Sequence, residues 1–176
     1  MKTMQFMCGV TLIELLTTLS AVAVTLTLGV PTFTTFQATV CRAEATSALM
    51  TSFKYARSEA ARHNGAVQLC ASTDGLTCSM ATPPNWSTGW ILLADLDDDG
   101  AIDDLVHYAN FTEPGFTLRT QLVDQNDTAV TAITLSSNGF PNATGTFTFC
   151  DAREYRVLTL GFVGRIEQSA SGQGCP

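Results

Sequence analysis

The longest apolar stretch of the chain lies near its start. Between Leu15 and Val40 no side chain is ionisable, and the first part of this stretch is mainly Leu, Val and Ala with Thr and Ser among them. Roughly 20 apolar residues in a helix span the core of a bilayer, and Ser and Thr hydroxyls can bond to a carbonyl one turn earlier. The pattern therefore predicts a membrane-length helix over residues 10–31.

A second helical pattern covers residues 32–64. Apolar residues recur there at helical spacing, and most charged residues fall between them. The apolar positions are Phe33, Phe36, Val40, Leu49, Phe53, Ala56 and Ala60. This spacing predicts an amphipathic helix that lies against a sheet and ends at Asn64-Gly65. Because Pro31 removes one backbone hydrogen bond, we expect it to bend the long helix at that point.

After Gly65 the pattern changes to short β-rich segments separated by turn residues. The predicted strands are residues 66–72, 89–95, 105–111, 116–122, "TAITLSS" in the 130s, 145–150 and 155–162. The class is therefore α+β, with a long N-terminal helix packed on an antiparallel β-sheet head formed by residues 65–176.

Composition excludes some functions. The chain has 176 residues, with 9 Lys+Arg against 16 Asp+Glu and a net charge of −7, which opposes binding to nucleic acid. Six cysteines in a chain of this size favour an oxidising compartment. We find no catalytic, nucleotide-binding or metalloprotease motif. The sequence predicts neither an enzyme nor a bound cofactor.

Three interpretations of the N-terminus compete. Ordinary signal peptidase could cut at Ala21-Val22-Ala23, but Glu14 would then lie inside the apolar region. A lipid could be attached at Cys8, but the bulky residues that precede this cysteine, Phe6 and Met7, disfavour attachment. In the third interpretation the chain is cut after Gly9 and keeps its helix.

The third interpretation agrees with a known pattern. "GVTLIELL" (residues 9–16) resembles the class III signal peptide of type IV pilin-like proteins. The resemblance implies that a prepilin peptidase removes the leader, residues 1–9, by cutting between Gly9 and Val10, and then methylates the Val10 amine. Glu14 becomes the fifth residue and Pro31 the twenty-second, where pilins carry a glutamate and a helix-kinking proline.

The resemblance also assigns a role to Glu14. A carboxylate in the apolar core of a membrane costs about 2.5–3.5 kcal/mol on insertion scales, and the helix dipole offsets part of that cost. In the family, the glutamate of an incoming subunit pairs with the N-terminal amine of its neighbour. Glu14 is therefore expected to direct assembly, the alternative being a glutamate that reaches the membrane edge.

Other segments are similar to the GspH/FimT branch of these proteins. They are "ARSEAARHNGAVQLCAST" (56–73), Trp86 with "GWILLADLDDDG" (to 100), "SSNGFP" (136–141) and "GR" (164–165). Within the branch, the cysteine pattern resembles that of the minor pilins FimT and FimU.

Cleavage of the leader would leave five of the cysteines. We expect disulfides between Cys70 and Cys78 and between Cys150 and Cys175, each worth about 2–4 kcal/mol. No C-x-x-C pair or nearby histidine supports the rival zinc site. The remaining Cys41 is expected to be a small buried residue, or to form an intermolecular bond.

"DLDDDGAIDD", residues 95–104, matches the opening of a calcium loop, with Asp95, Asp97 and Asp99 as candidate ligands. Val106 stands where such a loop needs a glutamate, although Asp103 or Asp104 could substitute. The alternative is a solvated turn, which Asp and Gly also favour.

The resemblance implies a minor pilin in type IV pilus assembly or in the pilus tip. It would sit in the inner membrane with its head in the periplasm, and its partners would be other pilins, the prepilin peptidase and the assembly platform. The alternatives are a type II secretion pseudopilin, and DNA uptake through Arg165. The second arginine of the G-R-x-R motif of DNA-binding relatives is replaced here by Glu167.

Overall fold

The computed structural model describes residues 10–97, 99–111, 116–151 and 153–175; within the long helix, the side chains of residues 27–35 and 38 are not described. The described chain forms two compact units that meet between Val40 and Cys41. The first unit is helical, and the second, here called the head, holds the rest of the helix and all the strands.

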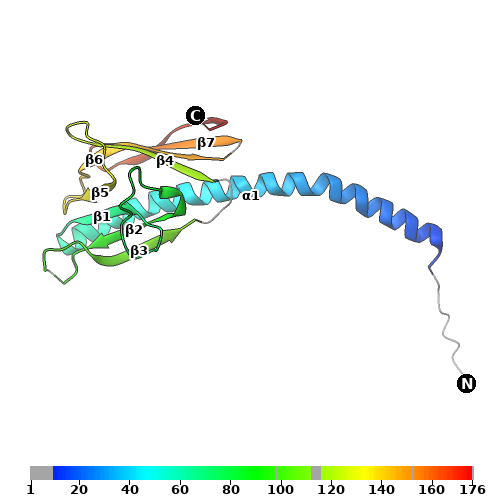
Figure 1. The fold of residues 1–176 in the computed structure, drawn as a ribbon, viewed down its shortest axis with the longest axis horizontal. Helices are drawn as coiled ribbons and strands as arrows, with labels where there is room; N and C mark the ends of the chain where they lie inside the picture. Colours follow the sequence, from blue (N-terminus) through cyan, green and yellow to red (C-terminus); the bar gives the residue numbers. More distant parts are fainter. Residues whose placement is uncertain (1–9, 98, 112–115, 152, 176) are drawn as a thin grey trace, which may run out of the picture. The chain divides into compact units, whose positions relative to one another are not determined.

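Helix α1 runs from Leu12 to His63 (Figure 1). Thr11 caps its start, because the Thr11 hydroxyl accepts a hydrogen bond from the Glu14 backbone N–H at 3.3 Å. At its end Asn64 adopts a left-handed conformation with φ 49°, and the Gly65 N–H donates to the Ala60 carbonyl at 3.2 Å. This is a Schellman end, with asparagine in the position that glycine usually takes.

The first sheet contains four antiparallel strands in the order β3-β2-β1-β5. They are β1 (Val67–Ala71), β2 (Gly89–Ala94), β3 (Asp104–Asn110) and β5 (Ala132–Leu135). Every residue of β2 is buried, which accounts for its continuous apolar sequence "GWILLA". A short 3-10 helix, Trp86–Thr88, leads into β2 and places the Trp86 ring in the core.

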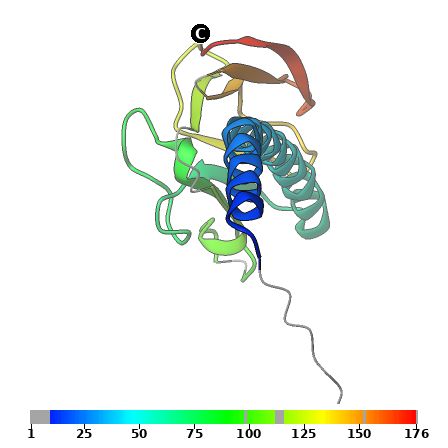
Figure 2. The ribbon, with the colours of Figure 1, turned by 90° about the vertical axis from the view of Figure 1, so that its right-hand side faces the viewer.

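The second sheet is also antiparallel, in the order β4-β6-β7-β8. Its strands are β4 (Thr117–Asp124), β6 (Ala143–Cys150), β7 (Glu154–Leu160) and β8 (Ile166–Gln173). In Figure 2 the orange and red strands of this sheet lie above the teal part of helix α1, and the green segments of the first sheet lie to its left.

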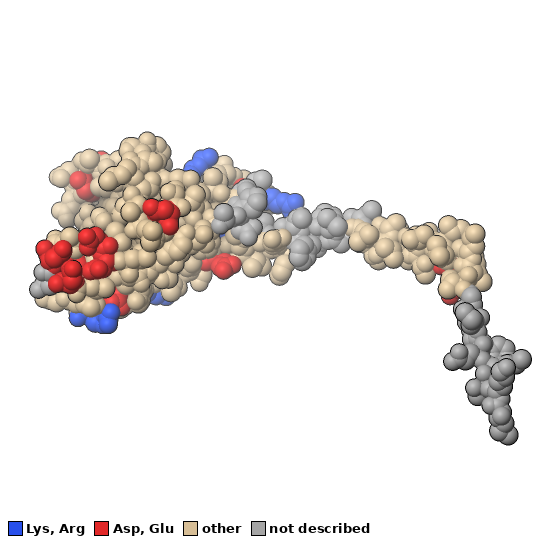
Figure 3. Space-filling model, turned by 60° about the horizontal axis from the view of Figure 1, so that its bottom comes forward, with Lys and Arg blue, Asp and Glu red and all other residues tan. Residues whose placement is uncertain are grey.

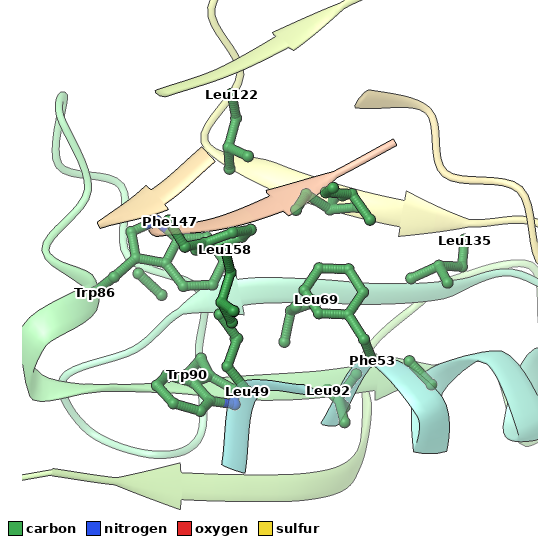
Figure 4. Packing of buried hydrophobic residues seen from close by; sticks show 14 of the residues in the cluster. Leu49, Phe53, Leu69, Trp86, Trp90, Leu92, Leu122, Leu135, Phe147 and Leu158 are labelled. Atoms are coloured by element: carbon green, nitrogen blue, oxygen red, sulfur yellow. The ribbon is translucent and has the colours of Figure 1, made fainter. Parts of the chain in front are cut away.

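One apolar core joins the helix to both sheets. The Phe53 ring of α1 meets the Phe147 ring of β6 edge to face at 5.8 Å, and Trp86 approaches the same Phe147 ring at 5.4 Å. Figure 4 shows Leu49 and Phe53 directed into the space where Leu69, Leu92 and Leu158 also lie. The predicted apolar face of the helix is therefore correct from Leu49 to Ala60.

The structure confirms the predicted α+β class, a long N-terminal helix with antiparallel strands, with two differences in detail. Each predicted strand is present within a residue or two of its expected bounds. The head nevertheless contains two sheets where one was expected, and strand β8 was not predicted. Its sequence "IEQSASGQ" lacks alternating apolar residues because β8 is an exposed edge strand.

Candidate functional site

The residues that the resemblance assigns to processing and assembly lie at the start of helix α1. Gly9 and the rest of the leader are outside the described residues, and Val10 is 71% exposed. Glu14 lies in the first turn of the helix with its side chain exposed. Its backbone N–H is bonded to Thr11, so the sequence Thr-x-x-Glu also forms half of a capping box. A carboxylate here stabilises the positive end of the helix dipole.

The helix surface that follows is apolar and exposed. Its large apolar side chains from the first turn onward are Leu12, Ile13, Leu15, Leu16, Leu19, Val22, Val24 and Leu26, each more than half exposed. Hydroxyls between them bond to backbone carbonyls one turn earlier, as Thr17 does to Glu14 at 3.0 Å and Ser20 to Leu16 at 2.8 Å. These hydroxyls therefore need no water, and the surface suits an apolar environment.

No helix in the described part of the chain combines the length and the apolar character that crossing a bilayer requires. Helix α1 continues through Pro31. The bend at Pro31 and the membrane span of residues 10–31 stay predictions.

Arg42 is the charged residue whose role the sequence did not reveal. It is only 1% exposed, and its guanidinium pairs with the carboxylates of Asp151 and Glu154, the latter at 2.5 Å. These partners lie 109 and 112 residues further along the chain, at the turn between β6 and β7. No local sequence signal identifies such a distant pair. Arg42 thus ties the beginning of the head to its second sheet.

Both expected disulfides are present. Cys70 bonds to Cys78, and Cys150 bonds to Cys175, which ties the tail that follows β8 to the end of β6. Cys41 is half-buried and takes part in neither disulfide, so both of its expected roles stay open.

Asp74 organises the loop that the first disulfide closes. Its carboxylate accepts hydrogen bonds from the backbone N–H groups of Leu76 and Thr77, both at 2.9 Å, and from the hydroxyls of Ser72 and Thr77. These bonds, above all those from the Thr77 and Leu76 backbone, hold the pKa of Asp74 far below its usual range. An aspartate whose side chain accepts from the backbone N–H two residues later forms an Asx turn, a local signal that the sequence carries in Asp74-Gly75-Leu76.

The candidate calcium ligands Asp95, Asp97 and Asp99 do come together, with carboxylate oxygens within 4.8 Å of one another. The charge of Asp99 is the main cause that raises the pKa of Asp97. Asp95 also accepts hydrogen bonds from the backbone of Asp99 and Gly100, at 3.2 and 3.0 Å. The same carboxylates thus shape the turn, and calcium binding stays a prediction.

Arg165 forms an ion pair with Glu167, Nε to Oε2 at 3.0 Å, at the surface of β8. The residue before it, Gly164, is buried with φ +70°, and a Cβ there would come within 2.5 Å of the Gly139 carbonyl. The Arg57 guanidinium lies against both glycines and donates weakly to the Gly164 carbonyl at 3.5 Å. Three separate sequence motifs, around residues 57, 139 and 164, therefore converge at one place.

The comparisons with known proteins agree with this architecture. The family model described as "Type II transport protein GspH" matches residues 45–164, which is more than half of the chain. No curated protein matches the chain significantly.

Two solved structures share the fold. Both are crystal structures of the type IV minor pilin FimU of Pseudomonas aeruginosa, in different space groups. Each is 23% identical to this chain with a TM-score of 0.52 and covers 76% of it; the matches extend over 98% and 93% of the FimU chains. At this identity the likeness establishes the fold. Together with the family match, it shows that the chain belongs to the GspH/FimT family of type IV pilin-like proteins.

Proposed function

We propose that this chain is a minor pilin of the FimT/FimU kind, which takes part in the assembly of a type IV pilus or of its tip complex. The observation that carries the proposal is the combination of Val10 and Glu14 with an exposed apolar helix surface at one end of α1. Membership of the family and the pilin-like fold of the head support it. The role is structural and requires no cofactor.

The proposed assembly step uses the chemistry of this helix end. A prepilin peptidase removes residues 1–9 and exposes the Val10 amine, which the same enzyme methylates. The Glu14 carboxylate then pairs with the amine of a neighbouring subunit. In apolar surroundings this charge-assisted contact replaces the lost water and fixes the register of the two helices.

The proposed location follows from the same segment. Residues 10–31 hold the subunit in the inner membrane before assembly, and the head lies in the periplasm, where the disulfides of Cys70 and Cys150 form. The assembly platform of the inner membrane then transfers the subunit into the pilus.

Charge removal at Glu14 tests the proposal. We expect Glu14→Ala and Glu14→Gln to lower the amount of the protein recovered in sheared pili by roughly tenfold or more, since a contact worth about 1.4 kcal/mol changes binding tenfold. Glu44→Gln is the matched control, because Glu44 is exposed on the same helix but lies in the head. Normal recovery of Glu14→Ala in pili would overturn the proposal.

A second candidate is a pseudopilin of a type II secretion system, which the description of the matching family favours. Deletion of the gene separates the two candidates. Loss of pili with normal protein secretion supports the minor pilin, and the reverse result supports the pseudopilin.

A further inference from the structure

A groove on the head combines positive charge with an apolar floor. It has a volume of about 410 Å³ and lies between helix α1 and the turn that joins β7 to β8. Lys54, Arg57 and Arg165 supply the charge, and none of its lining residues is acidic. The apolar lining residues are Phe53, Val163 and Ile166, of which Val163 is 57% exposed.

The positive side chains of this groove make few ion pairs and hydrogen bonds within the described chain. Among the described residues, no ion pair or hydrogen bond engages the Lys54 ammonium. Within the described part of the chain, Arg57 makes only the long 3.5 Å bond to the Gly164 carbonyl. Glu167 occupies the Nε side of Arg165 from outside the groove. In a chain with net charge −7, a positive groove is a local exception that attracts anionic groups.

The acidic loop of the chain has the complementary character. We use this name for Asp95, Leu96, Asp97, Asp99, Asp103 and Asp104. The loop joins β2 to β3 at the left-hand end of the head in Figure 1, and Figure 3 shows acidic side chains gathered at that end. Its Leu96 is 45% exposed between two aspartates. The raised pKa of Asp97 reflects repulsion within the loop, which nearby cations would relieve.

We propose that the groove formed by Lys54, Arg57 and Arg165 binds the acidic loop of a second copy of this chain, with the aspartates against the cations and Leu96 over the apolar floor. The two surfaces belong to different elements of the same head. The contact can therefore be made in both directions within a two-fold dimer, or can repeat from one subunit to the next. It concerns the heads alone and does not depend on Glu14.

The apolar floor distinguishes this partner from a nucleic acid. Duplex DNA presents phosphates to a protein and requires several cations without nearby acids. Here Glu167 neutralises part of Arg165, and the remaining groove has Phe53 and Val163 beside its charges. A peptide loop in which two aspartates flank an exposed leucine matches this mixture better.

Chemical cross-linking between isotopically distinct copies tests the proposal. The full-length protein, purified in detergent at low salt, is mixed as ¹⁵N-labelled and unlabelled copies and treated with a carbodiimide, which joins an ammonium to a carboxylate in direct contact. We expect mixed-isotope peptides that link Lys54 to the acidic loop. Asp97→Lys should lower their yield about fivefold, because exposed ion pairs contribute up to about 1 kcal/mol each.

Charge exchange provides the controls. Glu44→Lys alters an exposed charge outside the loop and should leave the yield unchanged. Mixing Lys54→Glu copies with Asp97→Lys copies should restore the cross-link, now with the carboxylate in the groove and the ammonium on the loop. The absence of mixed-isotope links, or links from Lys54 to carboxylates elsewhere, would overturn the proposal. So would gel-shift binding of a duplex oligonucleotide that is lost in Lys54→Glu while no link to the loop forms.

Discussion

Leu26 and Leu49 belong to the same helix but have opposite environments. Leu26 is 60% exposed in the N-terminal unit, whereas Leu49 is 0% exposed in the head. In the head, both sheets cover the apolar face of α1 and bury it in one core. In the N-terminal unit the apolar side chains stay at the surface of the described chain. The part of the helix in the head is therefore stabilised by burial within the chain. The N-terminal part presents an apolar surface suited to a lipid or protein partner.

We expect the largest loss of unfolding free energy from a substitution at Arg42, next to the boundary between the two units. Arg42→Ala leaves the carboxylates of Asp151 and Glu154 without their buried cation, and such a change costs about 3–5 kcal/mol of unfolding free energy. Urea unfolding followed by the fluorescence of the buried Trp86 and Trp90 measures it. Arg165→Ala removes an exposed ion pair and should cost no more than about 1 kcal/mol. Equal effects of the two substitutions would show that Arg42 does not anchor the head.

Leucine truncation compares the two halves of the helix directly. Leu49→Ala should lower the unfolding free energy by about 2–5 kcal/mol, since it opens a cavity in the core. Leu16→Ala, on the exposed surface, should change it by less than about 0.5 kcal/mol. The same urea titration reports both. A large effect of Leu16→Ala would mean that the N-terminal surface already has a partner within the chain.

The two disulfides stabilise the head to different degrees. Chain entropy predicts losses of about 3.5 kcal/mol for Cys150→Ser with Cys175→Ser and about 2.5 kcal/mol for Cys70→Ser with Cys78→Ser. The difference reflects the sequence separations of 25 and 8 residues. Denaturant midpoints of the two double variants measure the losses. The reverse order would show that the loop around Asp74, rather than the tail, limits the stability of the head.

Substitution of Asp74 should have the smallest effect on stability, and that effect should depend on pH. Since its folded-state pKa is lowered, its carboxylate stabilises the loop above its unfolded pKa, near pH 4, and this stabilisation is lost as the pH falls through the lower folded value. Hydrogen exchange of the Leu76 and Thr77 amides should therefore be slower than in Asp74→Asn at neutral pH. This advantage should shrink below about pH 4. An advantage that does not change with pH would exclude the carboxylate as its cause.

The elements of the fold were predictable where burial produces a regular pattern. Alternating or continuous apolar residues marked each strand from β1 to β7, and the Asn64-Gly65 end of the helix was located correctly. Strand β8 escaped prediction because pairing with β7 and the Cys150–Cys175 disulfide hold it, rather than apolar burial. The sequence predicted a helix from residue 10, close to the observed start at Leu12, but could not place Arg57 beside Gly139 and Gly164, since long-range contacts leave no local pattern.

The N-terminus of the native protein tests the central claim most directly. We propose that the apolar end of helix α1 is an assembly surface exposed by removal of residues 1–9. Intact-mass and N-terminal sequence measurement of the protein isolated from its own cells should therefore show a chain that begins at Val10 and retains the helix. A chain that still begins at Met1, or one that begins beyond Leu26, would contradict the account.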